Sequence, residues 1–254
     1  MRHPPLSRAA VGSRVIRLTR IPSTNNRAKE LARSGAPHGT VVVAAEQTEG
    51  RGQRGRRWVS PRGGLWASAL LRPHGVPAAL AGLIGIAAAT ASAEATSALS
   101  GVAVTVKWPN DVLVSGRKVG GVLVETGIAA EKVAWAVIGI GINANIAVEA
   151  LPLSLRRSAT TLLHETGREI ALEGLLSDMC ARLEGLMRLL ENGQTDQVLV
   201  RWRTVDTTPG RLVRASNGAW AGTASGIDAA GQLLISARDG HLITVPTSAG
   251  VNIE

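Results

Sequence analysis

The sequence of 254 residues contains no tyrosine, no phenylalanine and a single cysteine. One cysteine excludes an internal disulfide and indicates a reducing compartment, so we expect a cytoplasmic protein. Cys180 lies among apolar residues at helical spacing, which favours a core position over a reactive thiol. The five histidines are scattered singly, so the sequence predicts no zinc site.

Long apolar runs of the kind that cross membranes are also missing. The most apolar segment, residues 80–93, is too short and too rich in alanine and glycine to span a bilayer, and the N-terminus lacks an apolar core of signal length. With 45% hydrophobic and 19% charged residues, the composition is that of a folded globular protein. We therefore expect no membrane association. A length of 254 residues is enough for one large core plus a small second module.

Negative charge is scarce, with 19 acidic against 28 basic residues and a net charge of +9. This excess suggests an anionic partner, although an arginine-rich composition explains the total equally well. A local cluster is more informative. Residues 50–58, GRGQRGRRW, form a glycine–arginine loop without an acidic residue, suited to close approach and to binding phosphate or carboxylate. The indole face of Trp58 can stack on a purine. The alternative to a ligand-binding loop is an exposed basic turn with Trp58 in the core.

Residues 50–55 match the G-x-G-x-x-G pattern of dinucleotide-binding folds, but their context excludes that interpretation. No helical pattern starts at Gly55, and no acidic residue occurs between Glu49 and Glu94, where a ribose-binding carboxylate would stand. A Walker-type phosphate loop is absent as well. The loop can instead surround a phosphate with backbone N–H groups while its arginines neutralise the charge.

Two further polar segments follow in the chain. KWPND at residues 107–111 places a lysine, an amide and a carboxylate at the end of a predicted strand, where binding sites are often built. The alternative is a turn in which Asn110 and Asp111 cap local backbone groups. GRKVGGVLVE at residues 116–125 places Lys118 beside two glycines that leave room for a ligand.

The hydrophobic pattern divides the chain near Pro209 and Gly210 into two modules. The short, closely spaced strands of the second module are typical of a small barrel. Alternating and β-branched runs predict strands at residues 15–18, 41–45, 65–71, 102–107, 112–114, 119–126, 133–142, 211–214, 219–227, 232–236 and 242–245. Apolar spacing and capping residues predict helices at residues 24–33, 77–97 and 172–190, and around residue 202.

Five motifs occur in the order seen in biotin protein ligases, namely STN at 23–25, GRGQRGRRW at 50–58, KWPND at 107–111, GRKVGGVLVE at 116–125 and GIGIN at 139–143. The chain therefore resembles this family over almost its whole length. The resemblance implies an α/β (α+β) fold with a central mixed, mostly antiparallel sheet flanked by helices, in a catalytic domain at residues 13–205. It also implies a small SH3-like β-barrel domain at residues 209–254.

Members of this family activate biotin with ATP to biotinyl-5′-AMP and transfer biotin to one lysine of a biotin carboxyl carrier protein. The resemblance implies the same ligase activity here, with ATP, biotin and Mg²⁺ as small molecules and the carrier protein as partner. Too few residues precede the first predicted strand for the winged helix-turn-helix of bifunctional members, so we expect no binding to DNA. A homodimer is left open.

Carried over position by position, the resemblance also implies site residues. The catalytic residues are Lys118, Arg51, Lys107 and Asp111: the cations stabilise charge at the α-phosphate, and Asp111 orients the acceptor amine or takes its proton. No metal site made of protein ligands alone is implied, because Mg²⁺ bridges the phosphates. The biotin-binding residues are Ser23, Thr24, Asn25, Gln47, Gly50, Arg51, Gly52, Gln53, Lys118 and Gly121. By this resemblance the first four contact the biotin head, and Arg51 and Lys118 are cations on its carboxylate side. The residues that bind ATP or the adenylate are Arg54, Arg56, Trp58, Lys107, Asn110, Asp111 and Asn143.

Gln53 departs from the common GRGRRGR form of the loop, which has arginine at this position, and this bears on how tightly the adenylate is retained. Three alternatives to an active biotin ligase remain. A lipoate ligase or octanoyltransferase shares the fold class, but its R-R-x-S-G-G-G-x-V-x-H segment is absent. A basic nucleic-acid-binding module would use Trp58 and the loop, with binding that depends steeply on salt. An inactive variant of the ligase is suggested by Gln53 and by the lack of phenylalanine and tyrosine.

Overall fold

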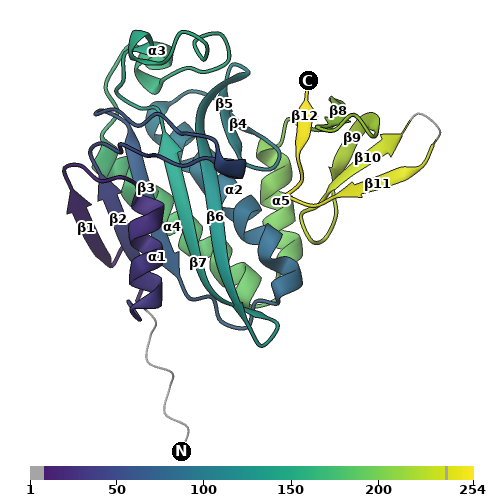
Figure 1. The fold of residues 1–254 in the computed structure, drawn as a ribbon, viewed down its shortest axis with the longest axis horizontal. Helices are drawn as coiled ribbons and strands as arrows, with labels where there is room; N and C mark the ends of the chain where they lie inside the picture. Colours follow the sequence, from purple (N-terminus) through teal and green to yellow (C-terminus); the bar gives the residue numbers. More distant parts are fainter. Residues whose placement is uncertain (1–8, 238–239) are drawn as a thin grey trace, which may run out of the picture.

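The computed structural model describes residues 9–237 and 240–254, which form two β-sheets with helices packed against the larger one (Figure 1). The central sheet has seven strands in the order β1-β2-β3-β7-β6-β5-β4. Within the described residues, its neighbouring strands are antiparallel except for β1 and β2, so the predicted mixed, mostly antiparallel sheet is confirmed. Its strands are β1 Arg14–Leu18, β2 Thr40–Ala44, β3 Leu65–Leu71, β4 Val104–Lys107, β5 Asp111–Val114, β6 Arg117–Ala129 and β7 Lys132–Ile142.

All seven strands of the central sheet were predicted, with small differences at their ends. The largest difference is in β6, which continues to Ala129 because its pairing with β7 extends as far as Ala129 and Lys132. Helix α1 (Thr24–Arg33) connects the parallel strands β1 and β2, and Ser23 caps its N-terminus as predicted.

Helices cover both faces of the central sheet (Figure 1). Helix α1 packs on one face through Ala28 and Ala32, against a small core that includes Val42. The neighbouring Val41 points to the opposite face, where the larger core lies with α2 (Ala81–Ser100) and α4 (Leu172–Glu191). The short helix α3 was not predicted, since five residues are too few to show helical periodicity. The remaining helices are α2 Ala81–Ser100, α3 Leu162–Thr166, α4 Leu172–Glu191 and α5 Thr195–Val205.

Helix α2 and the turn before it, Ala78–Ser100, are long and apolar enough by composition to cross a membrane. The helix is longer than the apolar run at residues 80–93, and Gly101 in the left-handed conformation ends it. Most of its side chains are buried in the larger core together with those of α4. This packing accounts for the apolar composition of α2.

The second module is a five-stranded antiparallel sheet in the order β11-β10-β9-β8-β12. Four of its strands were predicted; β12 was missed because three residues are too few for an alternating pattern. Within the described residues β11 and β12 are the edges, so strand pairing does not close the sheet into a barrel. The division into domains at 13–205 and 209–254 stays a prediction. The strands are β8 Leu212–Ala215, β9 Ala221–Ile227, β10 Leu233–Ala237, β11 Leu242–Val245 and β12 Val251–Ile253.

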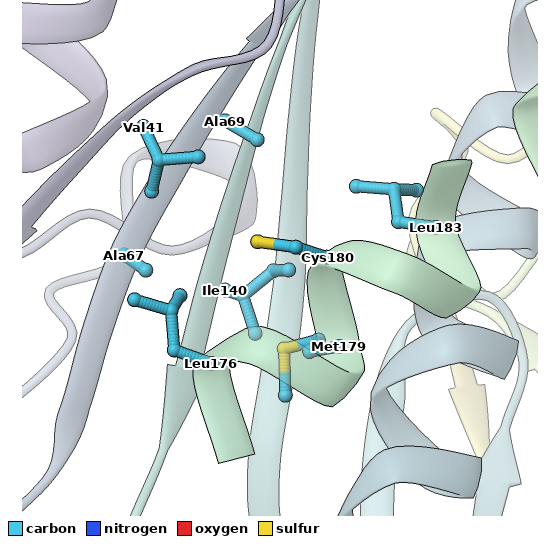
Figure 2. A pocket seen from close by; sticks show the side chains of 8 residues that line it. All are labelled: Val41, Ala67, Ala69, Ile140, Leu176, Met179, Cys180 and Leu183. Atoms are coloured by element: carbon cyan, nitrogen blue, oxygen red, sulfur yellow. The ribbon is translucent and has the colours of Figure 1, made fainter. Parts of the chain in front are cut away.

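A small apolar cavity lies between α4 and the central sheet (Figure 2). Met179 and Cys180 of α4 line it opposite Val41 and Ile140. Its volume of about 10 Å³ leaves room for no more than one water molecule. Burial raises the pKa of the Cys180 thiol to about 11, so the predicted core role of this cysteine is confirmed.

Candidate functional site

The polar motifs of the sequence meet on the central sheet because of its strand register. Lys107 on β4 pairs with Asp111 on β5, which pairs with Gly121 on β6. Gly121 in turn pairs with Gly141 on β7. One row of residues across four strands thus joins the motifs KWPND, GRKVGG and GIGIN, and this row forms the base of the candidate site.

Two glycines of β7 allow other side chains to approach this sheet. A Cβ atom at Gly141 would lie 2.7 Å from Nε1 of Trp58, and one at Gly139 would lie 2.0 Å from Oδ1 of Asn25. Any side chain at these positions would therefore displace Trp58 or Asn25. The sequence analysis did not assign either glycine to the site. The available signal was their spacing of two residues, which places both on one face of a strand.

The residues predicted to bind the biotin head lie together at the start of α1. Thr24 donates its backbone N–H and its hydroxyl to Oε1 of Gln47 at 2.8 and 3.0 Å. Gln47 donates from Nε2 to Oγ of Ser60 at 2.9 Å. Oγ of Ser23 accepts the backbone N–H of Asn26 at 3.4 Å and so caps the helix. Hydrogen bonds within the protein thus order the polar atoms at this end of the site.

Ser68 on β3 belongs to the same group, although the sequence analysis missed it. Its Oγ is fully buried and lies 2.8 Å from Oγ1 of Thr24 and 2.6 Å from Oδ1 of Asn25. The hydroxyl of Thr24 also lies 3.0 Å from Oε1 of Gln47. The hydroxyl groups of Thr24 and Ser68 therefore take part in three oxygen–oxygen contacts but have only two protons to donate. The available signal was one serine in an otherwise apolar strand.

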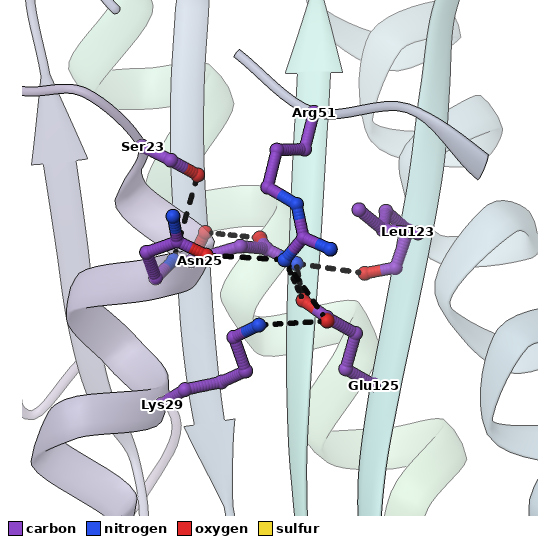
Figure 3. A network of polar contacts seen from close by, with 8 residues as sticks. Ser23, Asn25, Lys29, Arg51, Leu123 and Glu125 are labelled. Carbon is purple, nitrogen blue, oxygen red and sulfur yellow. Dashed lines mark hydrogen bonds and ion pairs between the residues drawn. The ribbon is translucent and has the colours of Figure 1, made fainter. Parts of the chain in front are cut away.

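Glu125 on β6 is the centre of a second polar cluster (Figure 3). Its carboxylate accepts hydrogen bonds from Lys29 Nζ at 2.8 Å, Asn25 Nδ2 at 3.1 Å and Arg51 Nη1 at 3.0 Å. Burial raises the pKa of Glu125, but the hydrogen bonds from Lys29 and Asn25 and the nearby positive charges outweigh it, so this pKa lies below its ordinary value. The sequence analysis missed Glu125 and Lys29. Strand alternation, which places Glu125 on the face of Gly121, could have identified the carboxylate.

Asp111 is the centre of a third cluster, which contains two lysines. Nζ of Lys118 forms an ion pair with Oδ1 of Asp111, and Nζ of Lys107 lies 3.5 Å from Oδ2. Nζ of Lys118 also lies 5.2 Å from the centroid of the Trp58 ring, in a cation–π contact. The fold therefore brings together four residues that the sequence analysis placed in the site.

The two predicted adenylate-binding asparagines are bonded to the backbone. The side chain of Asn110 donates from Nδ2 to the carbonyl of Val122 at 2.6 Å, and the backbone carbonyl of Asn110 accepts the N–H of Val122 at 3.1 Å. Asn143 is buried and donates from Nδ2 to the carbonyl of Thr160 at 3.1 Å. Asn110 thus fastens the KWPND turn to the distant strand β6, and Asp111 pairs with two lysines, so the alternative in which both residues cap local backbone groups does not describe this turn. Both asparagines border the row of residues described above.

The glycine–arginine loop folds into a tight turn with its arginines at the surface. The N–H of Gly52 donates to the carbonyl of Arg56 at 2.7 Å, and the N–H of Trp58 donates to the carbonyl of Gly50 at 2.8 Å. Arg54 and Arg56 are exposed, and within residues 9–237 and 240–254 neither forms an ion pair. Trp58 is half-buried, so the alternative of a turn anchored by a core tryptophan applies only in part.

A groove of about 390 Å³ opens beside the loop. It lies between the loop, α2, β6 and residues 247–248 of the second module, and it adjoins the KWPND turn. Its volume falls in the range of ligand-binding pockets. Its lining residues are Gln53, Arg54, Ala81, Gly82, Gly85, Ile86, Pro109, Asn110, Val122, Leu123, Val124, Thr126, Thr247 and Ser248.

Trp108 connects the site to the second module. Its buried indole donates from Nε1 to the carbonyl of Gly231 at 3.0 Å, and its backbone N–H donates to Oγ1 of Thr208 at 2.8 Å. Thr208 lies in the connection between α5 and β8. The second module therefore helps to position the turn that carries Lys107 and Asp111.

The carboxylates of the site are paired with cations. Glu125 contacts Lys29 and Arg51, and Asp111 contacts Lys107 and Lys118. In the part of the chain that the structure describes, no three His, Cys, Asp or Glu side chains are grouped to hold a metal ion. The arrangement suits anionic ligands, and a divalent cation would fit here as the partner of a ligand's phosphates.

Comparisons with known proteins point to one family. Residues 17–143 match the biotin/lipoate A/B protein ligase family. The bifunctional ligase/repressor BirA of Bacillus subtilis is 34% identical over 238 residues, which cover 92% of this chain and 73% of that protein. The biotin–[acetyl-CoA-carboxylase] ligase of Paracoccus denitrificans is 42% identical over 128 residues, 50% of this chain and 52% of that protein. The structure of biotin protein ligase from Aquifex aeolicus in complex with biotin and ATP has a TM-score of 0.78 and 27% identity, covering 95% of this chain and 99% of that chain.

Proposed function

We propose, since the chain belongs to the biotin/lipoate A/B protein ligase family, that it activates biotin with ATP to biotinyl-5′-AMP and transfers biotin to a lysine of a biotin carboxyl carrier protein. The observation that carries this proposal is the row Lys107, Asp111, Gly121 and Gly141 across four strands. This row joins the three motifs on one surface, with Trp58 packed over Gly141 and two lysines beside Asp111.

The charges of the site fit the first step, in which two anions must meet. Each carboxylate of the site is shared by two cations, which leaves one net positive charge at Glu125 and one at Asp111. A carboxylate oxygen of biotin attacks the α-phosphorus of ATP, and the bond from this phosphorus to pyrophosphate breaks. Lys107 and Lys118 stabilise the negative charge that develops, while Arg51 holds the biotin carboxylate.

In the second step the acceptor lysine attacks the acyl carbon of biotinyl-5′-AMP. An amide bond forms, the bond from the acyl carbon to the phosphate oxygen breaks, AMP leaves, and the amine loses a proton. Neighbouring cations favour the neutral amine that attacks, because like charges lower the pKa of a lysine. Asp111 is the carboxylate placed to accept a hydrogen bond from this amine and orient it, or to take its proton. Asp111→Asn should therefore slow transfer from preformed biotinyl-5′-AMP.

Mg²⁺ would accompany ATP in this mechanism and supply positive charge along its phosphates. Asp111 is a carboxylate that could face such an ion, and the exposed Arg54 and Arg56 could contact the phosphates themselves. We place the reaction in the cytoplasm, an assignment supported by the free and buried Cys180.

The edge of β6 supports a proposal for the carrier protein. β5 pairs with β6 only as far as Gly121, and within the described residues the rest of β6 pairs only with β7. Such an open edge beside the groove can accept an extended segment of a partner. A second copy of the chain could use the same edge, so a homodimer and the carrier complex would compete. Size-exclusion chromatography with and without the carrier checks this.

We also propose that residues 9–254 bind no operator DNA. The relative from Bacillus subtilis is a ligase and a repressor, and the similarity spans 73% of its length. The arginines of the loop are accounted for by anionic substrates, and Arg51 is already paired with Glu125. Specific binding to a promoter fragment that persists at high salt would contradict this proposal.

Incubation with biotin, ATP, Mg²⁺ and a carrier domain, followed by intact mass measurement, tests the ligase function. We expect the carrier to gain the mass of one biotin, and to gain nothing when ATP is omitted or its acceptor lysine is changed to arginine. An unmodified carrier without biotin binding would exclude the function. An unmodified carrier with biotin binding would favour the inactive variant, and transfer of lipoate or octanoate instead would favour the related transferase.

A further inference from the structure

Glu125 joins segments that are distant in the sequence (Figure 3). It lies on β6, and its carboxylate binds Asn25 and Lys29 of α1 and Arg51 of the glycine–arginine loop. Under the proposed function, Asn25 contacts the biotin head and Arg51 contacts the biotin carboxylate. One protein carboxylate therefore touches residues from both ends of the substrate site.

The hydrogen bonds of Arg51 leave part of its guanidinium group available. Nη1 donates to the two carboxylate oxygens of Glu125 at 3.0 and 3.1 Å and to Oδ1 of Asn26 at 3.1 Å. Nε and Nη2 have no hydrogen-bond partner among residues 9–237 and 240–254. Because the group is planar, fixing Nη1 also fixes the plane of the remaining N–H donors.

Glu125 also controls the charge around Arg51. Nζ of Lys29 and Nη1 of Arg51 lie 2.8 and 3.0 Å from the same carboxylate oxygen, Oε1. Without the carboxylate these cations would repel each other, and Arg51 would lose its strongest acceptor. Asp111 has the same relationship to Lys107 and Lys118 in the neighbouring cluster.

We propose, on the basis of the ligase function above, that Glu125 is a positioning residue which holds Arg51 in the orientation that binds the biotin carboxylate. It thereby sets the preference for biotin over an analogue that has no carboxylate. A competing role predicts the opposite sign. If Glu125 only occupied Arg51 in place of the substrate, its removal would strengthen biotin binding.

Titration calorimetry of Glu125→Gln with biotin and with biotinol, its neutral alcohol analogue, distinguishes these roles. The glutamine keeps an acceptor for Asn25 but loses the charge that holds Arg51. We expect biotin to bind about tenfold more weakly, while the affinity for biotinol stays within about twofold. An unchanged ratio of the two affinities, or tighter binding of biotin, would overturn the proposal. If the wild-type protein bound no biotin, the ligase function would fail first, and this proposal with it.

Two variants control for effects on folding. Glu173→Gln removes an exposed ion pair with Arg17 between α4 and β1, and it should change neither affinity. Glu125→Asp keeps the charge for Lys29 but shortens the side chain. It should therefore reduce the preference for biotin over biotinol, as Glu125→Gln does. If Glu125→Gln does not fold, an unchanged preference in a folded Glu125→Asp protein overturns the proposal.

Discussion

Trp108 donates its indole N–H to the backbone carbonyl of Gly231 at 3.0 Å, so a residue of the KWPND motif is bonded directly to a turn of the second module. Trp108→Phe removes the donor and leaves this buried carbonyl without a partner, which costs about 1–3 kcal/mol. We expect the free energy of unfolding to fall by about that amount. The KM for ATP should rise, because the turn that carries Lys107 and Asp111 is less firmly held. Urea denaturation and steady-state kinetics measure both effects.

Trp220→Phe is the matched control for this change. Trp220 packs at the edge of the same core, but its indole N–H has no hydrogen-bond partner in the part of the chain that the structure describes. Its replacement should cost less stability and leave the KM for ATP unchanged. Equal effects of the two substitutions on the KM would show that the bond to Gly231 does not influence the site.

Gly141→Ala tests the close approach of Trp58 to the sheet. The added Cβ would lie 2.7 Å from Nε1 of Trp58, so the indole must move away from its cation–π contact with Lys118. We expect the affinity for ATP or the adenylate to fall at least about tenfold while the protein still folds, since the displaced ring is only half-buried. Titration with a non-hydrolysable ATP analogue, together with circular dichroism, measures this separation of binding from folding.

Gly185→Ala provides the control, because a Cβ at Gly185 in helix α4 meets nothing within 4 Å. Replacing a glycine in a helix interior by alanine stabilises it by about 0.5–1 kcal/mol. Ligand affinity should stay at the wild-type value. Retention of full affinity in Gly141→Ala as well would remove Trp58 from the list of nucleotide-binding residues.

Local patterns were sufficient to predict most of the elements. The apolar run of β3 and the helical spacing of α4 identified these segments because their burial repeats over many residues. The short elements α3 and β12 carry too few residues for such a pattern. The parallel pairing of β1 with β2 and the open edges of the second sheet depend on contacts between distant segments, which a local pattern does not contain.

The candidate site shows the same division between local and distant information. The motifs themselves identified Lys107, Asp111 and Lys118, which the register then brings together. Ser68 and Glu125 were missed because a single polar residue in a strand does not show by itself which side chains it meets. Their part in the site depends on the strand face that they occupy and on side chains that arrive from α1 and the glycine–arginine loop.

Glu125 should also make the stability of the protein depend on pH. Its pKa in the folded protein lies below the ordinary value of 4.5, so its ionised form stabilises the fold above that pH. This contribution is lost as the pH falls through the lowered pKa. We expect the free energy of unfolding to decline below pH 4.5, and Glu125→Gln to remove part of that decline. Urea denaturation at a series of pH values from about 3 to 7 measures it.

The control for this pH dependence is Glu173→Gln. The pKa of Glu173 is also lowered, through its hydrogen bond with Arg17, but this pair is exposed to solvent and screened by salt. Its removal should change the pH profile less than Glu125→Gln does, and the difference should persist at high salt. Identical profiles for the two variants would mean that the carboxylate of Glu125 contributes no more than a surface charge.

Gln53→Arg tests the one departure of the glycine–arginine loop from the common form of its family. Gln53 begins the turn Gln53–Gly55 and lines the groove beside the KWPND turn. Under the proposed function this groove receives part of biotinyl-5′-AMP, so an arginine here would add a cation for its phosphate. We expect the adenylate to dissociate several-fold more slowly, and bystander lysines to receive correspondingly less biotin. Release of radiolabelled biotinyl-5′-AMP and labelling of serum albumin measure the two effects. Gln53→Leu, which has similar length but no charge, should release the adenylate at least as fast as the wild-type protein. If Gln53→Arg and Gln53→Leu released it equally fast, charge at this position would have no part in retaining the intermediate.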